Sequence, residues 1–72
     1  MLEKSVLAAR IAHAIANSPY SQEGVAREFG ITEQAVSGWV RTGKIGKGKL
    51  PKLAELTGMP LEYFLVENVS VS

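Results

Sequence analysis

Residues 22 to 41 constrain the fold of this chain more than any other stretch of its sequence. Apolar side chains recur there at helical spacing in two short groups that are separated by a glycine. The first group is Val25, Ala26 and Phe29, and the second is Val36 and Trp39. This spacing predicts two short helices that each bury one face and cross through a tight turn. The pattern is that of a helix-turn-helix.

The residues around the expected turn fit its geometry. Ala26 is small where the two helices should come closest, and Gly30 can adopt the left-handed conformation that ends a helix. Ile31 is expected to fill the corner between the helices. Ser21 and Thr32 are good N-caps, because their hydroxyl oxygens can accept from free backbone N–H groups. The two helices are therefore expected to begin just after Ser21 and Thr32.

The second helix of the motif separates a core face from an outer face. Val36 and Trp39 are expected to point inward, which assigns Trp39 to the core and not to stacking on a base. The outward residues are Gln34, Ser37, Gly38 and Arg41. A helix-turn-helix places its second helix in the DNA major groove, so these residues are the expected reading face.

Three further helices are expected around the motif, which gives an all-α domain of five helices. Apolar spacing predicts the first helix from residue 2 to about residue 16, and the polar run 17 to 19, with its proline, ends it. Another helix has Pro51 in its first turn and stops at Gly58. Pro60 can open a short last helix. Its apolar residues are Leu61, Tyr63, Phe64 and Leu65.

Residues 67 to 72 are expected to form a C-terminal tail outside the DNA-binding domain of residues 1 to 66. Val69 and Val71 alternate with serine, and the tail contains no helix signal. It can be a disordered end, an arm that pairs across a dimer, or the start of a linker to a further domain.

With 72 residues, the chain has room for one small domain with a modest core. It contains no cysteine, which excludes disulfides and thiolate metal sites. No segment approaches the ~20 apolar residues of a membrane span, and the first residues lack the layout of a signal peptide. We therefore expect a cytoplasmic protein with no metal, no cofactor, no membrane contact and no small-molecule substrate.

Positive charge is concentrated in one part of the chain, although the net charge is only +1. The basic residues of this part are Arg41, Lys44, Lys47, Lys49 and Lys52, with no acidic residue among them. The residues after Lys52 carry three glutamates and no base. Because the basic stretch follows the expected reading helix, its side chains are placed to neutralise DNA phosphates. The alternative is a solvated, flexible basic loop.

Catalysis is not expected. Residues 43 to 49 satisfy the first seven positions of a P-loop pattern, but Leu50 stands where a serine or threonine would hold magnesium. No apolar strand precedes the loop, and the chain is too short for the surrounding sheet. The only histidine, His13, lies on an alanine-rich segment with no evident nucleophile beside it.

The motif, the lysine-rich loop, the segment 50 to 54 and the segment 59 to 65 resemble the Cro/repressor (lambda-repressor-like, XRE-type) helix-turn-helix family of temperate phages and prophages. The resemblance covers about residues 5 to 66. It implies a compact five-helix domain that binds palindromic, double-stranded operator DNA as a homodimer, with its third helix in the major groove. The implied function is that of a transcriptional repressor, as a Cro-like protein or as the amino-terminal domain of a larger repressor, bound to the nucleoid of a bacterial cell.

The resemblance also assigns DNA contacts to individual residues. Gln22 corresponds to the phosphate-binding glutamine at the start of the second helix. The expected base-reading residues are Glu33, Gln34, Ser37 and Gly38. The expected phosphate-binding residues are Gln22, Thr32, Arg41, Lys44, Lys47 and Lys49.

Gln34 is the main candidate for base reading, because an amide can pair in bidentate fashion with adenine N6 and N7. Ser37 can bond to a base edge or to a phosphate. Glu33 can accept from a cytosine amino group, or it can stabilise the positive end of its helix. Gly38 leaves room for a sugar or a thymine methyl group, or is simply tolerated in the helix.

A protein-docking module, such as an antitoxin, is the alternative function. The apolar end from Leu61 to Val71 is the surface that would dock a partner. The basic loop favours DNA, because a pure docking domain does not need positive charge beside its second helix.

Overall fold

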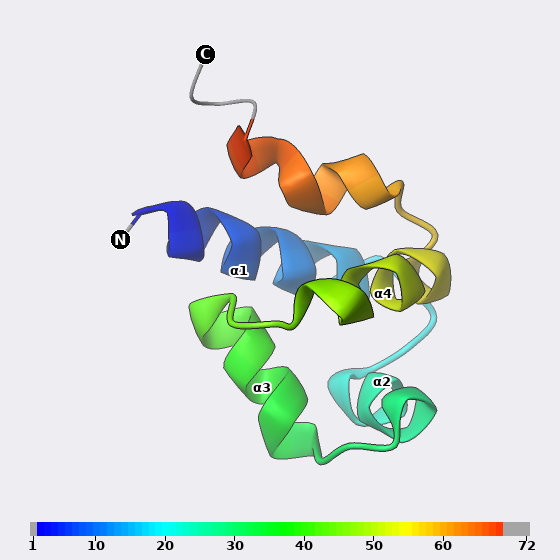
Figure 1. The fold of residues 1–72 in the computed structure, drawn as a ribbon. Coiled ribbons are helices and arrows are strands. Elements are labelled where there is room, and N and C mark those ends of the chain that lie inside the picture. Colours follow the sequence, from blue (N-terminus) through cyan, green and yellow to red (C-terminus); the bar gives the residue numbers. More distant parts are fainter. Residues whose placement is uncertain (1, 69–72) are drawn as a thin grey trace.

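The computed structural model describes residues 2 to 68 of the chain, and this part is all-helical (Figure 1). Its α-helices are α1 (Leu2–Ala16), α2 (Gln22–Phe29), α3 (Glu33–Thr42) and α4 (Leu50–Thr57). Two segments wind more tightly as 3-10 helices, η1 (Lys47–Lys49) and η2 (Leu61–Asn68). None of the helices in residues 2 to 68 has the length and apolar character needed to cross a membrane.

The expected fifth helix is the 3-10 helix η2, so the described residues contain four α-helices and the prediction of an all-α domain of five helices is not confirmed. The tighter winding starts directly after Pro60, whose carbonyl accepts from Tyr63 N at 2.9 Å. Within η2, Phe64 is fully buried. The rings of Tyr63 and Phe64 pack in a T-shaped arrangement, with their centres 5.3 Å apart. Because η2 reaches Asn68, residues 67 and 68 are helical, contrary to the expectation of a tail without helix signal. The expectations for residues 69 to 72 lie outside the described residues.

Helix α1 has the predicted bounds and is closed at its carboxyl end by polar side chains. The Asn17 side-chain amide donates to His13 O at 2.9 Å, and Ser18 Oγ donates to Ile15 O at 2.7 Å. These bonds satisfy carbonyls that the end of a helix leaves without a partner. The end of α1 is therefore fixed by the same polar run that predicted it.

The helix-turn-helix has the predicted caps. Ser21 Oγ accepts from Gly24 N at 3.1 Å, and Thr32 Oγ1 accepts from Ala35 N at 3.2 Å. Gly30 takes the left-handed conformation at φ +69°, and its N–H donates to the last turn of α2. Helix α2 therefore ends at the glycine, and α3 begins three residues later.

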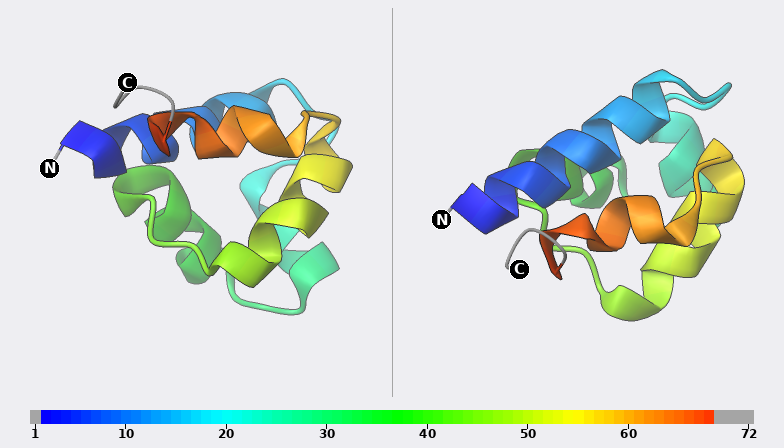
Figure 2. Two further views of the ribbon diagram at one scale, coloured as in Figure 1. Left: turned by 45° about the horizontal axis from the view of Figure 1, so that its top comes forward. Right: turned by 90° about the horizontal axis from the view of Figure 1, so that it is seen from above.

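The core collects side chains from all four α-helices and η2. Its fully buried large residues are Ile11, Val25, Val36, Leu53 and Phe64. Trp39 is 5% exposed, which confirms its place in the core. Its ring and the Phe29 ring pack in a T-shaped arrangement, with their centres 5.2 Å apart. Helix α1 packs on α3 on one side and on η2 on the other, and η2 runs beside α1 in the opposite direction (Figures 1 and 2). This arrangement leaves the outer face of α3 uncovered.

Candidate nucleic-acid interface

The outer face of α3 presents one continuous polar stripe. Helical geometry places Glu33, Gln34, Ser37, Gly38 and Arg41 within an arc of about 140°. Glu33, Gln34 and Arg41 are exposed, whereas Ser37 and Gly38 are half-buried. Val36 and Trp39 point into the core from the opposite side of the helix. Four of the five positions therefore combine a polar or charged side chain with access to solvent.

The surface above Gly38 is open. A Cβ atom placed on this residue would meet no other atom within 4 Å. The Gly38 carbonyl accepts from Thr42 Oγ1 at 2.8 Å, so the backbone there remains tied to the last turn of α3. A ligand can therefore approach the α3 backbone at Gly38 more closely than at its neighbours.

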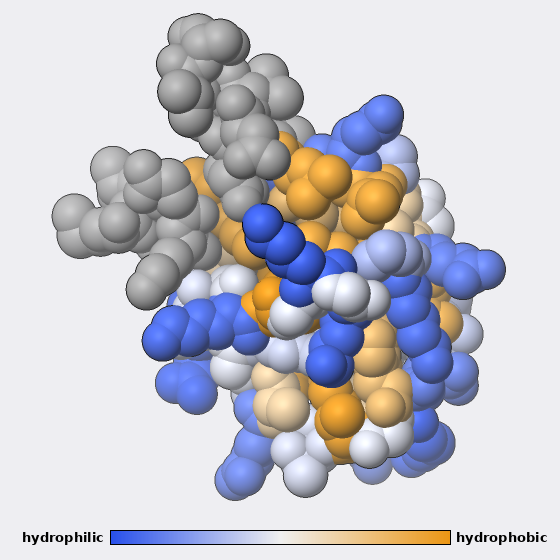
Figure 3. Space-filling model, viewed as in Figure 1, coloured by the Kyte–Doolittle hydropathy of each residue, from blue (hydrophilic) through white to orange (hydrophobic). Residues whose placement is uncertain are grey.

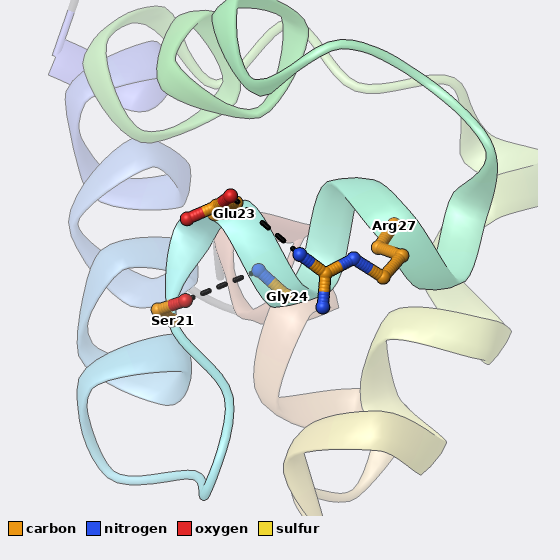
Figure 4. Close-up of polar contacts among 4 residues, drawn as sticks. All are labelled: Ser21, Glu23, Gly24 and Arg27. Atoms are coloured by element: carbon orange, nitrogen blue, oxygen red, sulfur yellow. Dashed lines mark hydrogen bonds and ion pairs between the residues drawn. The ribbon is translucent and has the colours of Figure 1, made fainter.

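The amino end of α2 carries backbone donors beside this stripe. The Ser21 hydroxyl caps Gly24 N (Figure 4), while the N–H groups of Gln22 and Glu23 have no partner within the helix. Glu23 forms an exposed ion pair with Arg27 at 3.5 Å, one turn along the same helix (Figure 4). An exposed pair of this kind adds little stability. The amino end of α2 therefore combines free N–H donors with the Gln22 side chain.

A side-chain hydrogen bond joins the start of α2 to the middle of α3. Ser37 Oγ donates to Gln22 Oε1 at 3.4 Å, and both side chains are half-buried. Ser37 was expected to face outward, but its hydroxyl points toward Gln22 instead. Of the predicted contact residues, this pair is the one that the structure brings together by a direct side-chain bond.

Thr32 contributes its hydroxyl oxygen to the cap of α3 and is itself exposed. A threonine hydroxyl that accepts one bond still has a hydrogen to donate. The residue can therefore cap the helix and reach an acceptor on a ligand at the same time.

The basic stretch begins in the last turn of α3 and continues into the loop after it, and four of its predicted cations are exposed. Arg41, Lys44, Lys47 and Lys49 are exposed. The loop backbone is fixed at its start, since Gly43 takes a left-handed conformation and Lys44 N donates to Thr42 Oγ1 at 3.2 Å. Ile45 packs against the core. The positive charges therefore extend from an anchored backbone.

Lys52 differs from the other basic residues of this stretch. Its Nζ donates to the carbonyl of Glu28 at 2.8 Å and lies 5.1 Å from the centre of the Phe29 ring. These contacts tie α4 to the last turn of α2. No local pattern could have predicted this role, because the partners are 24 residues apart. Lys52 is exposed like the four other cations, but its ammonium group is also bonded within the fold.

The P-loop-like segment 43 to 49 follows an α-helix and contains a turn and the 3-10 helix η1. It therefore lacks the strand that a P-loop requires before it. Among the side chains of residues 6 to 65, no three histidine, cysteine, aspartate or glutamate groups gather as a metal site would need.

A second surface feature is an apolar hollow of about 440 Å³ beside the basic loop. Its lining comes from α1, the loop, α4 and η2, and consists of Leu7, Ile45, Lys47, Leu50, Pro51, Leu61 and Leu65. Figure 3 shows apolar surface over η2 with hydrophilic side chains around it. Leu61 is one of the exposed large apolar residues of the described chain, at 38%. The hollow is separate from the outer stripe of α3.

Comparison with known proteins gives no match to a family model, to a curated protein or to a solved structure.

Proposed function

We propose that this protein is a sequence-specific, double-stranded DNA-binding transcriptional regulator that inserts α3 into the major groove. The observation that carries the proposal is the arrangement around the polar stripe of α3. The amino end of α2 contacts the stripe at Ser37, and the exposed cations of the basic loop follow its last turn. Donors for phosphate thus lie beside a polar helical face that is free to enter a groove.

The chemistry of each side chain decides whether it is proposed to contact a base or a phosphate. Gln34, exposed in the first turn of α3, presents an amide that matches adenine N6 and N7. Gln22, Thr32, Arg41 and the loop lysines donate to phosphate oxygens and release counterions, which makes affinity fall as salt rises. Base contacts set sequence preference, and phosphate contacts set position.

The proposed active form is a homodimer on a palindromic site. Two copies related by a two-fold axis would place their α3 helices in successive major grooves, about 34 Å apart. Bound there, the dimer would repress transcription by excluding RNA polymerase. The resemblance of the motif and the loop to the Cro/repressor family of phages supports this assignment, and with it a bacterial cytoplasmic location and the absence of catalysis.

The proposal is tested by selecting sites from random duplex DNA with the purified protein and then titrating two variants. Gln34→Ala is expected to cost ~1–3 kcal/mol on the selected site and to relax preference at one base pair. Lys47→Ala is expected to weaken binding to all sequences alike and to lower the salt slope by about 1. A palindromic consensus bound cooperatively supports the dimer, whereas equal loss on selected and random DNA for Gln34→Ala contradicts its role.

A protein-docking module is the second candidate, and the apolar hollow with exposed Leu61 is the observation that favours it. The same selection experiment separates the two candidates. Absence of binding to any duplex at low salt would reject the regulator and favour docking through the hollow.

A further inference from the structure

Ser37 and Gln22 form a contact between the two helices of the motif that a purely outward Ser37 would not make. Ser37 Oγ donates to Gln22 Oε1 at 3.4 Å, across 15 residues of sequence. Both side chains are half-buried, so the contact lies where α2 and α3 meet and not at the exposed edge. The hydroxyl of Ser37 is therefore turned toward α2.

This contact engages one end of the Gln22 amide and leaves the other end for a ligand. A glutamine amide has one oxygen that only accepts and one nitrogen with two hydrogens that only donates. When Oε1 is held by Ser37, the Nε2 group must point to the other side of the amide. Phosphate oxygens only accept, so an amide held in this orientation offers the correct group without first having to rotate.

The same contact occupies the only hydrogen of the Ser37 hydroxyl. Serine can donate a single O–H bond. With that hydrogen given to Gln22, Ser37 has no donor left for a phosphate or for a base acceptor. Its oxygen can still accept from a base amino group, so the contact removes only the donor role that was expected of Ser37.

We propose that Ser37 is a positioning residue that orients the Gln22 amide toward a DNA phosphate. The inference rests on the proposed function and assigns a different task to one residue of the same site. It also links the two kinds of contact, because the phosphate contact of α2 is then set by the helix that reads the bases. At 3.4 Å the bond is longer than the usual 2.7–2.8 Å for O–H···O, so its effect is on orientation and hardly on folding.

The first arm of the test measures DNA binding by Gln22→Ala, Ser37→Ala and the double variant. Gln22→Ala is expected to weaken binding by about 3- to 10-fold on selected and random duplexes alike, which corresponds to loss of one hydrogen bond. Ser37→Ala is expected to weaken binding to both kinds of duplex alike but to a smaller extent, because the amide remains and only its orientation is lost. The double variant is expected to bind no more weakly than Gln22→Ala. Ser37→Thr keeps a hydroxyl and is expected to restore most of the affinity. The melting temperature of Ser37→Ala should stay within about 3 °C of the parent protein.

Gln34→Ala is the matched control, since it should change preference at one base pair. If Ser37→Ala does the same and leaves random DNA unaffected, Ser37 reads a base and the inference is wrong. Additive losses in the double variant would overturn it equally.

The second arm needs no DNA and separates this inference from the proposed function. The side-chain amide signals of Gln22 are followed by ¹⁵N NMR in the free protein. Ser37→Ala is expected to shift the Gln22 pair and to leave the Gln34 pair in place, and Ser37→Thr should shift it less. An unmoved Gln22 pair overturns the inference. A protein that binds no duplex while its Gln22 pair shifts would reject the proposed function and still show that Ser37 orients the amide.

Discussion

Gly30 and Gly38 show how the same residue type serves two different purposes in the helix-turn-helix. Gly30 takes φ +69°, which L side chains rarely adopt, whereas Gly38 has ordinary helical geometry. Neither position would place a Cβ within 4 Å of another atom. Space is therefore not the reason for either glycine. Gly30 is required by the backbone, whereas we propose that Gly38 leaves room for DNA to approach α3.

Gly30→Ala is expected to destabilise the fold by about 1 kcal/mol. The left-handed conformation costs a residue with a Cβ roughly 1–2 kcal/mol, and the stiffer unfolded chain offsets part of this. The free energy of unfolding from urea titration measures the effect. A variant as stable as the parent protein would contradict the assigned role of Gly30 at the end of α2.

Gly38→Ala is expected to stabilise the fold and to weaken DNA binding. Alanine inside a helix is favoured over glycine by up to ~1 kcal/mol, and nothing in the protein obstructs its methyl group. The methyl group would nevertheless stand between α3 and the DNA. Urea titration and a binding titration on the same sample check both effects, and unchanged affinity would remove Gly38 from the DNA surface.

Residue-scale features were predictable where the signal is local. The caps Ser21 and Thr32 and the left-handed Gly30 all act within a few residues of themselves, and the structure has each of them as expected. The contacts of Ser37 with Gln22 and of Lys52 with Glu28 join residues 15 and 24 positions apart. No local pattern encodes such pairs, because they depend on how whole helices meet.

Among the elements, α4 is held against α2 by Lys52. The carbonyl of Glu28 lies in the last turn of α2, where a helix leaves its acceptors without partners and favours a cation. The Lys52 ammonium supplies the missing donor at 2.8 Å and also lies near the Phe29 ring. This cation acts as a cap that a different helix provides.

Lys52→Met is expected to lower the free energy of unfolding by about 1 kcal/mol, because it keeps the apolar stem and removes the hydrogen bond. DNA affinity of the folded variant should be close to that of the parent protein. Lys44→Met is the matched control, since it removes an exposed loop cation and should weaken DNA binding with little change in stability. The assignment fails if both variants lose DNA affinity equally and neither loses stability.

The elements differ in how far the sequence predicted them. Helix α1 and the two helices of the motif carry both periodic apolar residues and polar ends, and their bounds were predicted to within a residue or two. The final element was predicted as a short helix after Pro60, and it winds as the 3-10 helix η2, in which the rings of Tyr63 and Phe64 pack against each other. Choosing between an α-helix and a 3-10 helix requires the surface that the segment packs on, which local sequence does not contain.

At the scale of the whole molecule, basic side chains lie on two parts of the surface that are candidates for binding an anion. One comprises Arg41 and the exposed loop lysines, next to the polar stripe of α3. The other is the outer side of α1, where the Arg10 guanidinium lies 4.8 Å from the Tyr63 ring centre and His13 is nearby. The Arg10 guanidinium lies over an aromatic ring, and this part of α1 offers one arginine against four exposed cations in the first region. We therefore expect DNA to bind to the first region.

Mapping the DNA-binding surface by NMR tests most directly whether DNA binds at the outer stripe of α3 and the basic loop. A short random-sequence duplex is added to ¹⁵N-labelled protein at low salt, where non-specific phosphate contacts alone suffice for binding. We expect backbone amide shifts at the amino end of α2, along the outer stripe of α3 and in the loop of residues 43 to 49, with η2 unchanged. Shifts concentrated around Arg10 and Tyr63, shifts concentrated at Leu61 and Leu65 of the apolar hollow, or no shifts at all would contradict this placement of DNA.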